Sequence, residues 1–341
     1  MCLCDDNAPR KINPEQYPHR RGYLTAMHKL ERLMLSSSFP ACCWAHCLLL
    51  FPCRRHAGFS YSGPAAAYAY KCVDTTNIER VFILGPSHHV YLNGCALSRC
   101  DEYETPLGNL KIDKDAIASL MQSKLFTYMT LEVDEDEHSI EMQLPFLFKI
   151  MERNTRPFAV VPVLIGAIDS KKEAVYGKLL APYLNEPNTL FIISSDFCHW
   201  GQRFRYTFKD ADAERGDPIY KSIERLDRRG MDAIETLDPK QFADYLRETD
   251  NTICGRHPIG VLLNAIQHAG ADQKSREHLE KKDKILQAED QGDGLPSRQQ
   301  VVEFIHYAQS SRVRSERESS VSYASGYYAN HPSAPAGQPT A

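Results

Sequence analysis

The side chains in this sequence that could do chemistry follow two short apolar runs. The run VFIL leads through a Gly-Pro turn to His88 and His89, and the run LFIIS leads to Asp196, Cys198 and His199. In α/β proteins with a parallel sheet, functional groups collect where the strands end at their carboxyl edge. If both runs are strands of one sheet, we expect these imidazoles and the carboxylate to gather at that edge.

Two further segments add metal-binding side chains in glycine-containing or proline-containing settings. HAGFSYSG begins with His56, and TICGRHP contains Cys254 and His257. Imidazole and thiolate together suit iron, copper or zinc better than magnesium or calcium, which prefer oxygen ligands. Two histidines with one carboxylate form a common non-heme iron(II) site, whereas a thiolate as third ligand favours copper or a redox-altered iron. A nearby aspartate and histidine could orient such ligands or move protons.

Each of these side chains also has a purely structural interpretation. A single histidine at the end of a strand is more often a hydrogen-bonded wall residue than a metal ligand. Asp196 alone could cap a turn, and Cys254 alone is most simply a small buried apolar residue. The clustering of six histidines between residues 56 and 257 in glycine, proline, serine or acidic settings favours a shared pocket.

An acidic segment, DEDEHSIEMQLPF, runs from Asp134 to Phe146 and contains His138 and Glu141. As a structural feature, it is an acidic first turn that complements the dipole of the apolar helix after it. As a functional feature, it directs His138 and Glu141 towards the mouth of the pocket.

Periodicity divides the chain into alternating strands and helices. Apolar runs predict strands over residues 81–84, 158–166 and 189–194, with further strands over 301–308 and 321–328. Amphipathic patterns predict helices over residues 113–122, 139–151, 171–184, 219–226, 239–246 and 258–268. This alternation indicates a single α/β domain with a mostly parallel sheet flanked by helices.

The overall composition excludes several classes of protein. With 43% hydrophobic and 25% charged residues, the chain is typical of a soluble globular protein. A net charge of −4 without a basic stripe gives no support for a nucleic-acid partner. The apolar stretch from Ser36 to Cys53 is interrupted by two prolines, and its purely apolar part, Cys47 to Phe51, is far shorter than the roughly 20 residues of a membrane span. We therefore expect a cytoplasmic protein without a membrane span.

Long strings of the sequence resemble the Memo family (mediator of ErbB-driven cell motility). The matching strings are HAGFSYSG, VFILGPSHHV, DEDEHSIEMQLP, VVPVLIGA, SSDFCHWGQRFRY, NTICGRHPIGVLLNAI, YAQSS and SSVSYASG. The family is similar in fold to the class III extradiol dioxygenases, which are non-heme iron enzymes. The resemblance therefore implies a similar α/β fold here.

The resemblance also implies roles for individual residues. It places the metal ligands at His56, His88 and Cys254, and catalytic residues of the same pocket at Asp196 and His199. Apart from the resemblance, we expect His89, His138, Glu141 and His257 to line the pocket or to support its ligands.

The function implied by the resemblance is the binding of iron or copper, with redox activity and a role in cell migration and cytoskeletal signalling in the cytoplasm and also the nucleus. The dioxygenases use a carboxylate as third ligand, so the thiol of Cys254 argues against ring cleavage. Any enzymatic activity would then be that of a metal-dependent oxidoreductase, and the sequence leaves turnover open. The alternative is a non-catalytic adaptor that binds phosphotyrosine peptides or cytoskeletal signalling proteins in the same pocket.

The first 55 residues depart from the family pattern. An HAGSWY-like string is absent, and Arg54 and Arg55 stand at the expected end of the buried strand before His56, which Cys47 to Phe51 could imitate. Either a mis-assigned gene start or genuine divergence would explain this departure from the family pattern. We therefore expect a divergent N-terminal segment over residues 1–55 and a Memo-like domain over 56–328. A polar insertion at about 270–297 and a disordered tail over 329–341 complete the predicted organisation.

Overall fold

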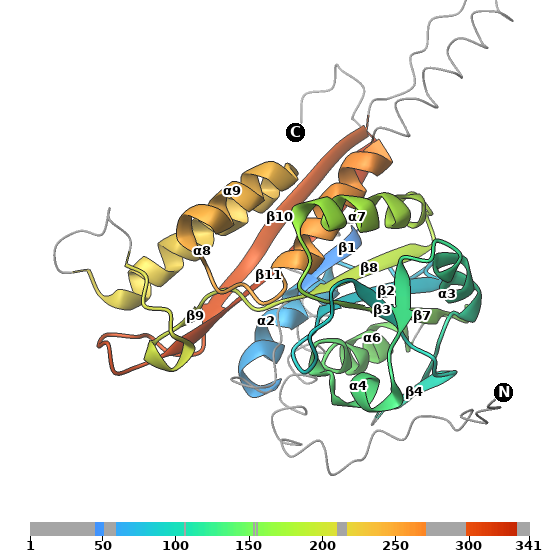
Figure 1. The fold of residues 1–341 in the computed structure, drawn as a ribbon, viewed down its shortest axis with the longest axis horizontal. Coiled ribbons are helices and arrows are strands. Elements are labelled where there is room, and N and C mark those ends of the chain that lie inside the picture. The colour runs from blue at the N-terminus through green and yellow to red at the C-terminus, as the bar shows by residue number, and fades with distance from the viewer. Residues whose placement is uncertain are drawn as a thin grey trace, which may run out of the picture.

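The central feature of the computed structural model is a sheet of nine strands with helices on both sides (Figure 1). The structure describes residues 45–50, 59–105, 107–152, 154, 156–209, 217–270 and 298–332. The strands lie in the order β10-β11-β1-β8-β2-β7-β3-β6, and β9 pairs with β11. Their bounds are β1 Ala45–Leu50, β2 Arg80–Pro86, β3 Cys95–Leu97, β6 Phe126–Tyr128, β7 Ala159–Ile165, β8 Thr189–Ser194, β9 His199–Trp200, β10 Arg298–Gln309 and β11 Ser320–Pro332. A separate hairpin joins β4, Glu102–Thr105, to β5, Gly108–Lys111.

The four neighbouring strands β1, β8, β2 and β7 are all parallel to one another. Both flanks contain antiparallel pairs, β1 with β11 and β7 with β3. The predicted α/β fold with a mostly parallel sheet is thus confirmed in the part of the sheet that carries the site. Continuous apolar runs form these central strands because helices cover both faces of the sheet, so side chains on both faces must be apolar.

The strands predicted at residues 81–84, 158–166 and 189–194 are confirmed as β2, β7 and β8. The short apolar run before His56 also forms a strand, because β1 covers most of it and pairs in parallel with β8. The two late strands are longer than predicted and form the long ribbon of β10 and β11 (Figure 1). The short strands β3 and β6 were not predicted, since three residues carry too little periodicity.

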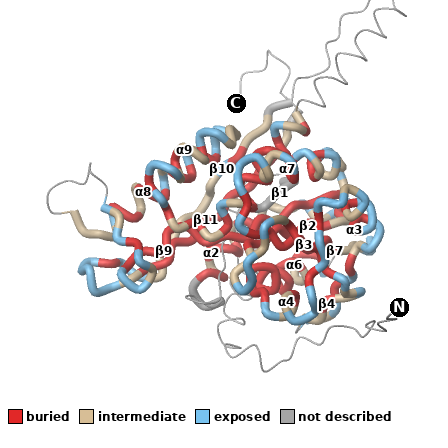
Figure 2. The backbone as a smooth tube through the Cα atoms, in the orientation of Figure 1, coloured by how far each residue is buried: buried red, intermediate tan, exposed pale blue. Residues whose placement is uncertain are grey.

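The helices of the described chain are α2 Phe59–Lys71, α3 Lys114–Met121, α4 Leu131–Asp136, α5 His138–Glu141, α6 Leu144–Met151, α7 Ser170–Leu184, α8 Ile219–Glu235 and α9 Pro239–Thr249. A further helix spans residues 256–270. Buried residues concentrate on the central strands, whereas α8 and α9 expose their outer faces (Figure 2). No helix in the described ranges is long and apolar enough to cross a membrane.

The single helix predicted over residues 139–151 is two helices, α5 and α6, with a break at Met142 and Gln143. Pro145 causes the break, because proline lacks the N–H that would bond to the carbonyl of Glu141 and its ring clashes with that carbonyl. Proline is instead well placed in the first turn of α6. The prediction of one continuous helix was therefore wrong, although both halves are helical.

Some of the predicted domain boundaries lie outside the described residues. The insertion at 270–297 falls there except for Gly270, and so do residues 1–44 and 333–341. Strand β11 continues to Pro332, which is three residues beyond the predicted start of the tail. The division of the chain at residues 55 and 328 stays a prediction.

A buried carboxylate on α8 connects the segments that follow β8 and α9. Asp227 is fully buried, and its Oδ1 accepts hydrogen bonds from the backbone N–H of Cys198 at 3.1 Å and from Asn251 Nδ2 at 3.2 Å. Its Oδ2 accepts one from the hydroxyl of Tyr307 at 2.8 Å. Burial raises the pKa of Asp227 from 3.8 to about 6, although hydrogen bonds from Ser322, Tyr307 and Asn251 oppose the shift.

This raised pKa predicts a specific dependence of stability on pH. Between its ordinary and its raised pKa, Asp227 holds a proton in the folded state and loses it in the unfolded state. The stability of the wild type relative to Asp227→Asn should therefore fall by about 3 kcal/mol as the pH rises from about 4 to about 7. Urea unfolding of both proteins across this range measures the difference, and other carboxylates cancel because both chains share them. A difference that does not change with pH would contradict the prediction.

Candidate metal centre

The site begins where β2 ends. Strands β2 and β8 are adjacent and parallel, with Leu84 opposite Ile193, so the residues after them emerge at the same edge of the sheet. After Pro86 the chain turns, because the Ser87 hydroxyl donates to the carbonyl of Val90 at 2.8 Å. This turn presents His88 and His89 beside α5.

Glu137, which caps the start of α5, fixes the position of His88. Its Oε2 accepts the backbone N–H of His88 at 2.8 Å, and its Oε1 lies 2.9 Å from the Nδ1 of the same residue. Oε1 also accepts the backbone N–H of Ser139 at 2.9 Å. Burial would raise the pKa of Glu137, but the hydrogen bonds and the charge of His88, with the charge of His138, lower it to about 2. Glu137 is therefore a carboxylate at neutral pH.

A carboxylate at Nδ1 determines the tautomer of His88. Because an ionised Glu137 can only accept, Nδ1 of His88 carries a hydrogen, and when the ring gives up its other proton to bind a metal the lone pair is on Nε2. Histidine ligands of metals are commonly held in this way by a carboxylate behind the ring. The arrangement therefore prepares His88 to bind a metal through Nε2.

The ring of His138, at the start of α5, packs directly against the ring of His88. The two rings stack with centroids 4.5 Å apart, and His89 Nε2 lies 3.4 Å from His138 Nδ1. In the described part of the chain, one group of three side chains has ligand atoms within 4.8 Å of one another, and it consists of His88, Glu137 and His138. Glu141 is buried on the same short helix as His138.

A second group forms at the end of β8. The backbone N–H of Asp196 donates to Cys254 Sγ at 2.9 Å, which attaches the segment after α9 to this strand end. The fully buried carboxylate of Asp196 has its Oδ2 3.5 Å from His199 Nε2. His199 Nδ1 lies 3.1 Å from the carbonyl of Phe197 and 3.0 Å from that of Thr252. Since carbonyls only accept, Nδ1 carries the hydrogen, and Nε2 faces the carboxylate.

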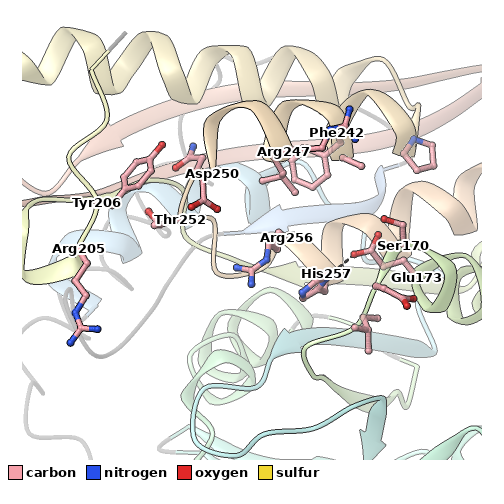
Figure 3. A pocket seen from close by; sticks show the side chains of 16 residues that line it. Ser170, Glu173, Arg205, Tyr206, Phe242, Arg247, Asp250, Thr252, Arg256 and His257 are labelled. Atoms are coloured by element: carbon pink, nitrogen blue, oxygen red, sulfur yellow. Dashed lines mark hydrogen bonds and ion pairs between the residues drawn. The ribbon is translucent and has the colours of Figure 1, made fainter.

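The structure thus gathers the predicted site residues into two groups at one edge of the sheet. His88, His89, His138 and Glu141 come from the end of β2 and from α5, whereas Asp196, His199 and Cys254 meet at the end of β8. His257 is separate, because it pairs with Glu173 at 2.7 Å on α7 (Figure 3). His56 lies outside the described residues, so the triad of His56, His88 and Cys254 stays a prediction.

Glu137 is the functional residue that the sequence analysis missed. It is one of several acids in the segment before His138, and the sequence pattern treats them alike. Contacts separate it from its neighbours, because Asp134 is buried as well but accepts from the hydroxyls of Ser98 and Tyr103, whereas Glu137 contacts His88. A clue was available, since an acid at the first position before a helix can cap it and a histidine needs a partner for its second nitrogen.

Close packing at Gly255 holds Cys254 against β8. A Cβ atom at Gly255 would lie 2.3 Å from Ser195 Cβ and 2.5 Å from the carbonyl oxygen of Ser194. The Gly255 backbone N–H also donates to Ser195 Oγ at 3.0 Å. A glycine is needed here because any side chain would push the segment with Cys254 away from the strand end.

Gly255→Ala should therefore destabilise the protein by about 1–3 kcal/mol, the usual cost of overpacking a tight contact. Thermal or urea unfolding measures the change. Gly270→Ala is the matched control, because among the described residues the nearest atoms to a Cβ there belong to the flexible side chain of Gln300, at 3.3 Å. If Gly255→Ala were as stable as Gly270→Ala, the segment around Gly255 would be able to move away from Ser195 at little cost, and the prediction would be wrong.

Comparison with known proteins identifies the family. The profile of the family described as Memo-like protein matches residues 17–327. Protein MEMO1 of Danio rerio is 51% identical over 271 residues, covering 80% of this chain and 82% of that protein. Protein MEMO1 of Homo sapiens is 49% identical over 276 residues, covering 81% and 84%. The memo-1 homolog of Caenorhabditis elegans is 46% identical over 277 residues, covering 81% and 71%.

Among solved structures, an uncharacterized protein from Escherichia coli K12 aligns with a TM-score of 0.43 and 11% identity, over 82% of this chain and 98% of that chain. This likeness is too weak to support an argument. The family profile and the relatives at about half identity are decisive, and they confirm the resemblance found in the sequence. The chain belongs to the Memo family.

Proposed function

We propose that this protein binds iron or copper through His88 and Cys254, with His56 as the third ligand, and that the bound metal is redox-active. The observation that supports the proposal most is the contact between Glu137 and His88, which leaves Nε2 of a neutral imidazole as the ligand atom. Cys254 lies at the end of the strand next to the one that leads to His88.

The chemistry of these donors fits a redox-active transition metal. Thiolate is the form of cysteine that binds metals, and the backbone N–H of Asp196 donates to Cys254 Sγ. One sulfur with imidazole nitrogens is a softer donor set than magnesium or calcium prefers. Iron or copper bound by these residues would supply one-electron redox chemistry.

The group of His88, Glu137 and His138 is an alternative set of ligands, but its contacts favour a supporting role. Both oxygens of Glu137 already accept N–H groups, and these come from His88 and Ser139. A metal on Glu137 would displace hydrogen bonds at a buried carboxylate, which is costly. We therefore assign Glu137 as the residue that orients His88, and His138 as the ring that packs against it.

Asp196 and His199 are suited to hold a proton near the metal ligands. His199 donates from Nδ1 to backbone carbonyls, which fixes the ring, and its Nε2 faces Asp196 Oδ2 at 3.5 Å. A proton taken up at Nε2 would be stabilised by the charge of that carboxylate. The pair could thus accept and release a proton beside Cys254, which would support turnover by a metal-dependent oxidoreductase.

Roles in cell migration and cytoskeletal signalling form part of the proposal through family membership alone. The adaptor alternative, with phosphotyrosine peptides as partners, is less favoured at this site. Glu137 and Asp196 are both buried there. The ionised Glu137 carboxylate would repel a doubly charged phosphate, and burial weakens the screening of that repulsion by water.

Metal analysis of variants tests the proposal. His88→Ala and Cys254→Ser should each lower the amount of bound metal about tenfold or more, because each removes a ligand, as measured by inductively coupled plasma mass spectrometry. His138→Gln should retain the metal. Cys72→Ser is the matched control, since its half-buried thiol donates to the carbonyl of Tyr68, a contact that a hydroxyl can keep. Loss of metal in His138→Gln together with full retention in Cys254→Ser would show that His88, Glu137 and His138 bind the metal instead.

The orienting role of Glu137 is tested by Glu137→Gln. The amide keeps one acceptor oxygen for the three N–H groups that Glu137 accepts, so the ring of His88 loses its fixed acceptor at Nδ1 and can place its hydrogen on Nε2, the proposed ligand atom. Metal affinity should fall about 10–100-fold. Chelator competition measures the affinity, and the nitrogen chemical shifts of His88 in metal-free protein report the tautomer. Glu132→Gln, on the exposed face of α4, should change neither. An unchanged tautomer of His88 in Glu137→Gln would contradict the orienting role of Glu137.

A further inference from the structure

A cavity lies beside the segment that carries Cys254. It has a volume of about 460 Å³ and lies between α9, the start of α7 and residues 250–257 (Figure 3). Thr252 and His257 line it, whereas Cys254, between them in the chain, contacts Asp196 instead. Its volume is within the usual range for small-molecule sites, roughly 300–1,000 Å³.

We propose that this cavity binds a small hydroxycarboxylic acid with an apolar body. The apolar body would occupy the wall formed by α9, where Phe242 and Leu246 line the cavity, with Ile168 opposite. An apolar wall with a few converging polar groups is the usual composition of a small-molecule site.

His257 supplies an acceptor for the ligand hydroxyl. Its Nδ1 lies 2.7 Å from Glu173 Oε1, and the side chains of the two residues are only 20% and 13% exposed. Because a carboxylate accepts, Nδ1 of His257 carries a hydrogen, and in the tautomer that this contact selects the ring lone pair is on Nε2. Nε2 makes no hydrogen bond within the described part of the chain. It is thus available to a hydroxyl group in the cavity.

Two arginines are available for the carboxylate. The guanidinium groups of Arg205 and Arg256 form no ion pair with a described residue, whereas Arg247 is paired with Asp244 at 2.8 Å. In Figure 3, Arg256 lies between Arg205 at one end of the cavity and the pair of His257 and Glu173. A guanidinium binds a carboxylate through two parallel hydrogen bonds, which fixes the orientation of the ligand.

The charge of the lining favours a carboxylate over a phosphate. Three acids balance the three arginines, and the six residues are Asp169, Glu173, Asp250, Arg205, Arg247 and Arg256. A singly charged head can contact Arg256 with little repulsion from Asp250. For a doubly charged phosphate the attraction to the arginines and the repulsion from the acids double alike, so the balanced lining adds little, whereas the cost of removing the ion from water rises more steeply than its charge.

Phenyllactate is the probe, because it combines an aromatic body, a hydroxyl and a carboxylate. Its binding to the full chain can be measured by isothermal titration calorimetry. Phenyllactamide, which lacks the charge, should bind at least about tenfold more weakly. Arg256→Gln should weaken phenyllactate about tenfold for the same reason, and Arg256 is exposed, so the fold should tolerate the change.

His257→Asn isolates the contact to the hydroxyl. The amide of asparagine can still donate to Glu173, but the acceptor at Nε2 is gone. Phenyllactate should bind about fivefold more weakly to this variant, the usual effect of one hydrogen bond. Hydrocinnamate, which lacks the hydroxyl, should bind the variant and the wild type equally.

Two controls separate this cavity from the metal centre. Arg156→Gln removes an arginine that pairs with Glu79 far from the cavity lining, and it should bind phenyllactate like the wild type. His88→Ala, which removes a proposed metal ligand outside the 250–257 segment, should bind phenyllactate normally while losing metal, so the two proposals fail separately. The inference is overturned if phenyllactate does not bind, if Arg256→Gln and His257→Asn leave its affinity unchanged, or if phenyl phosphate binds more tightly than phenyllactate.

Discussion

The parallel pairing of β2 with β8 is the constraint on which the rest of the site depends. Each strand ends in a turn that carries polar residues, and the pairing brings those turns to one edge of the sheet although about a hundred residues separate them in the chain. The apolar runs hold this register because both faces of the strands are buried, and a slip of one residue would exchange the side chains between the two faces. The positions of His88 and Asp196 are therefore consequences of core packing.

Buried carboxylates then fix the positions of the side chains and segments that the strand pairing brings together. Glu137 fixes the ring of His88 from α5, and Asp227 fixes the segments after β8 and α9 from α8. Each carboxylate accepts several N–H or O–H groups, which makes its removal from water tolerable. Opposite consequences follow for their pKa values, because Glu137 faces histidines and Asp227 faces neutral donors. A buried carboxylate is thus a fixed charge beside His88, whereas on α8 it has a pKa of about 6.

The segment over residues 250–257 lies between the candidate metal centre and the cavity beside α9. Its cysteine contacts the end of β8, and its threonine and histidine line the cavity. Thr252 also accepts the backbone N–H of His199 through its hydroxyl at 2.8 Å. A shift of this segment would therefore displace side chains at both places, because Gly255 packs too closely against Ser195 to absorb the movement.

The sequence by itself determined the fold class, the family and most of the elements that carry the site. Continuous apolar runs and helical periodicity are local signals, and they located β2, β7 and β8 and the residues that follow them. Only the tertiary structure decided which acid of the segment before α5 contacts His88, and that His257 faces Glu173 instead of Cys254. These outcomes depend on burial and on the packing of segments distant in the chain. Neighbouring residues of like charge carry no information about which of them the fold will bury.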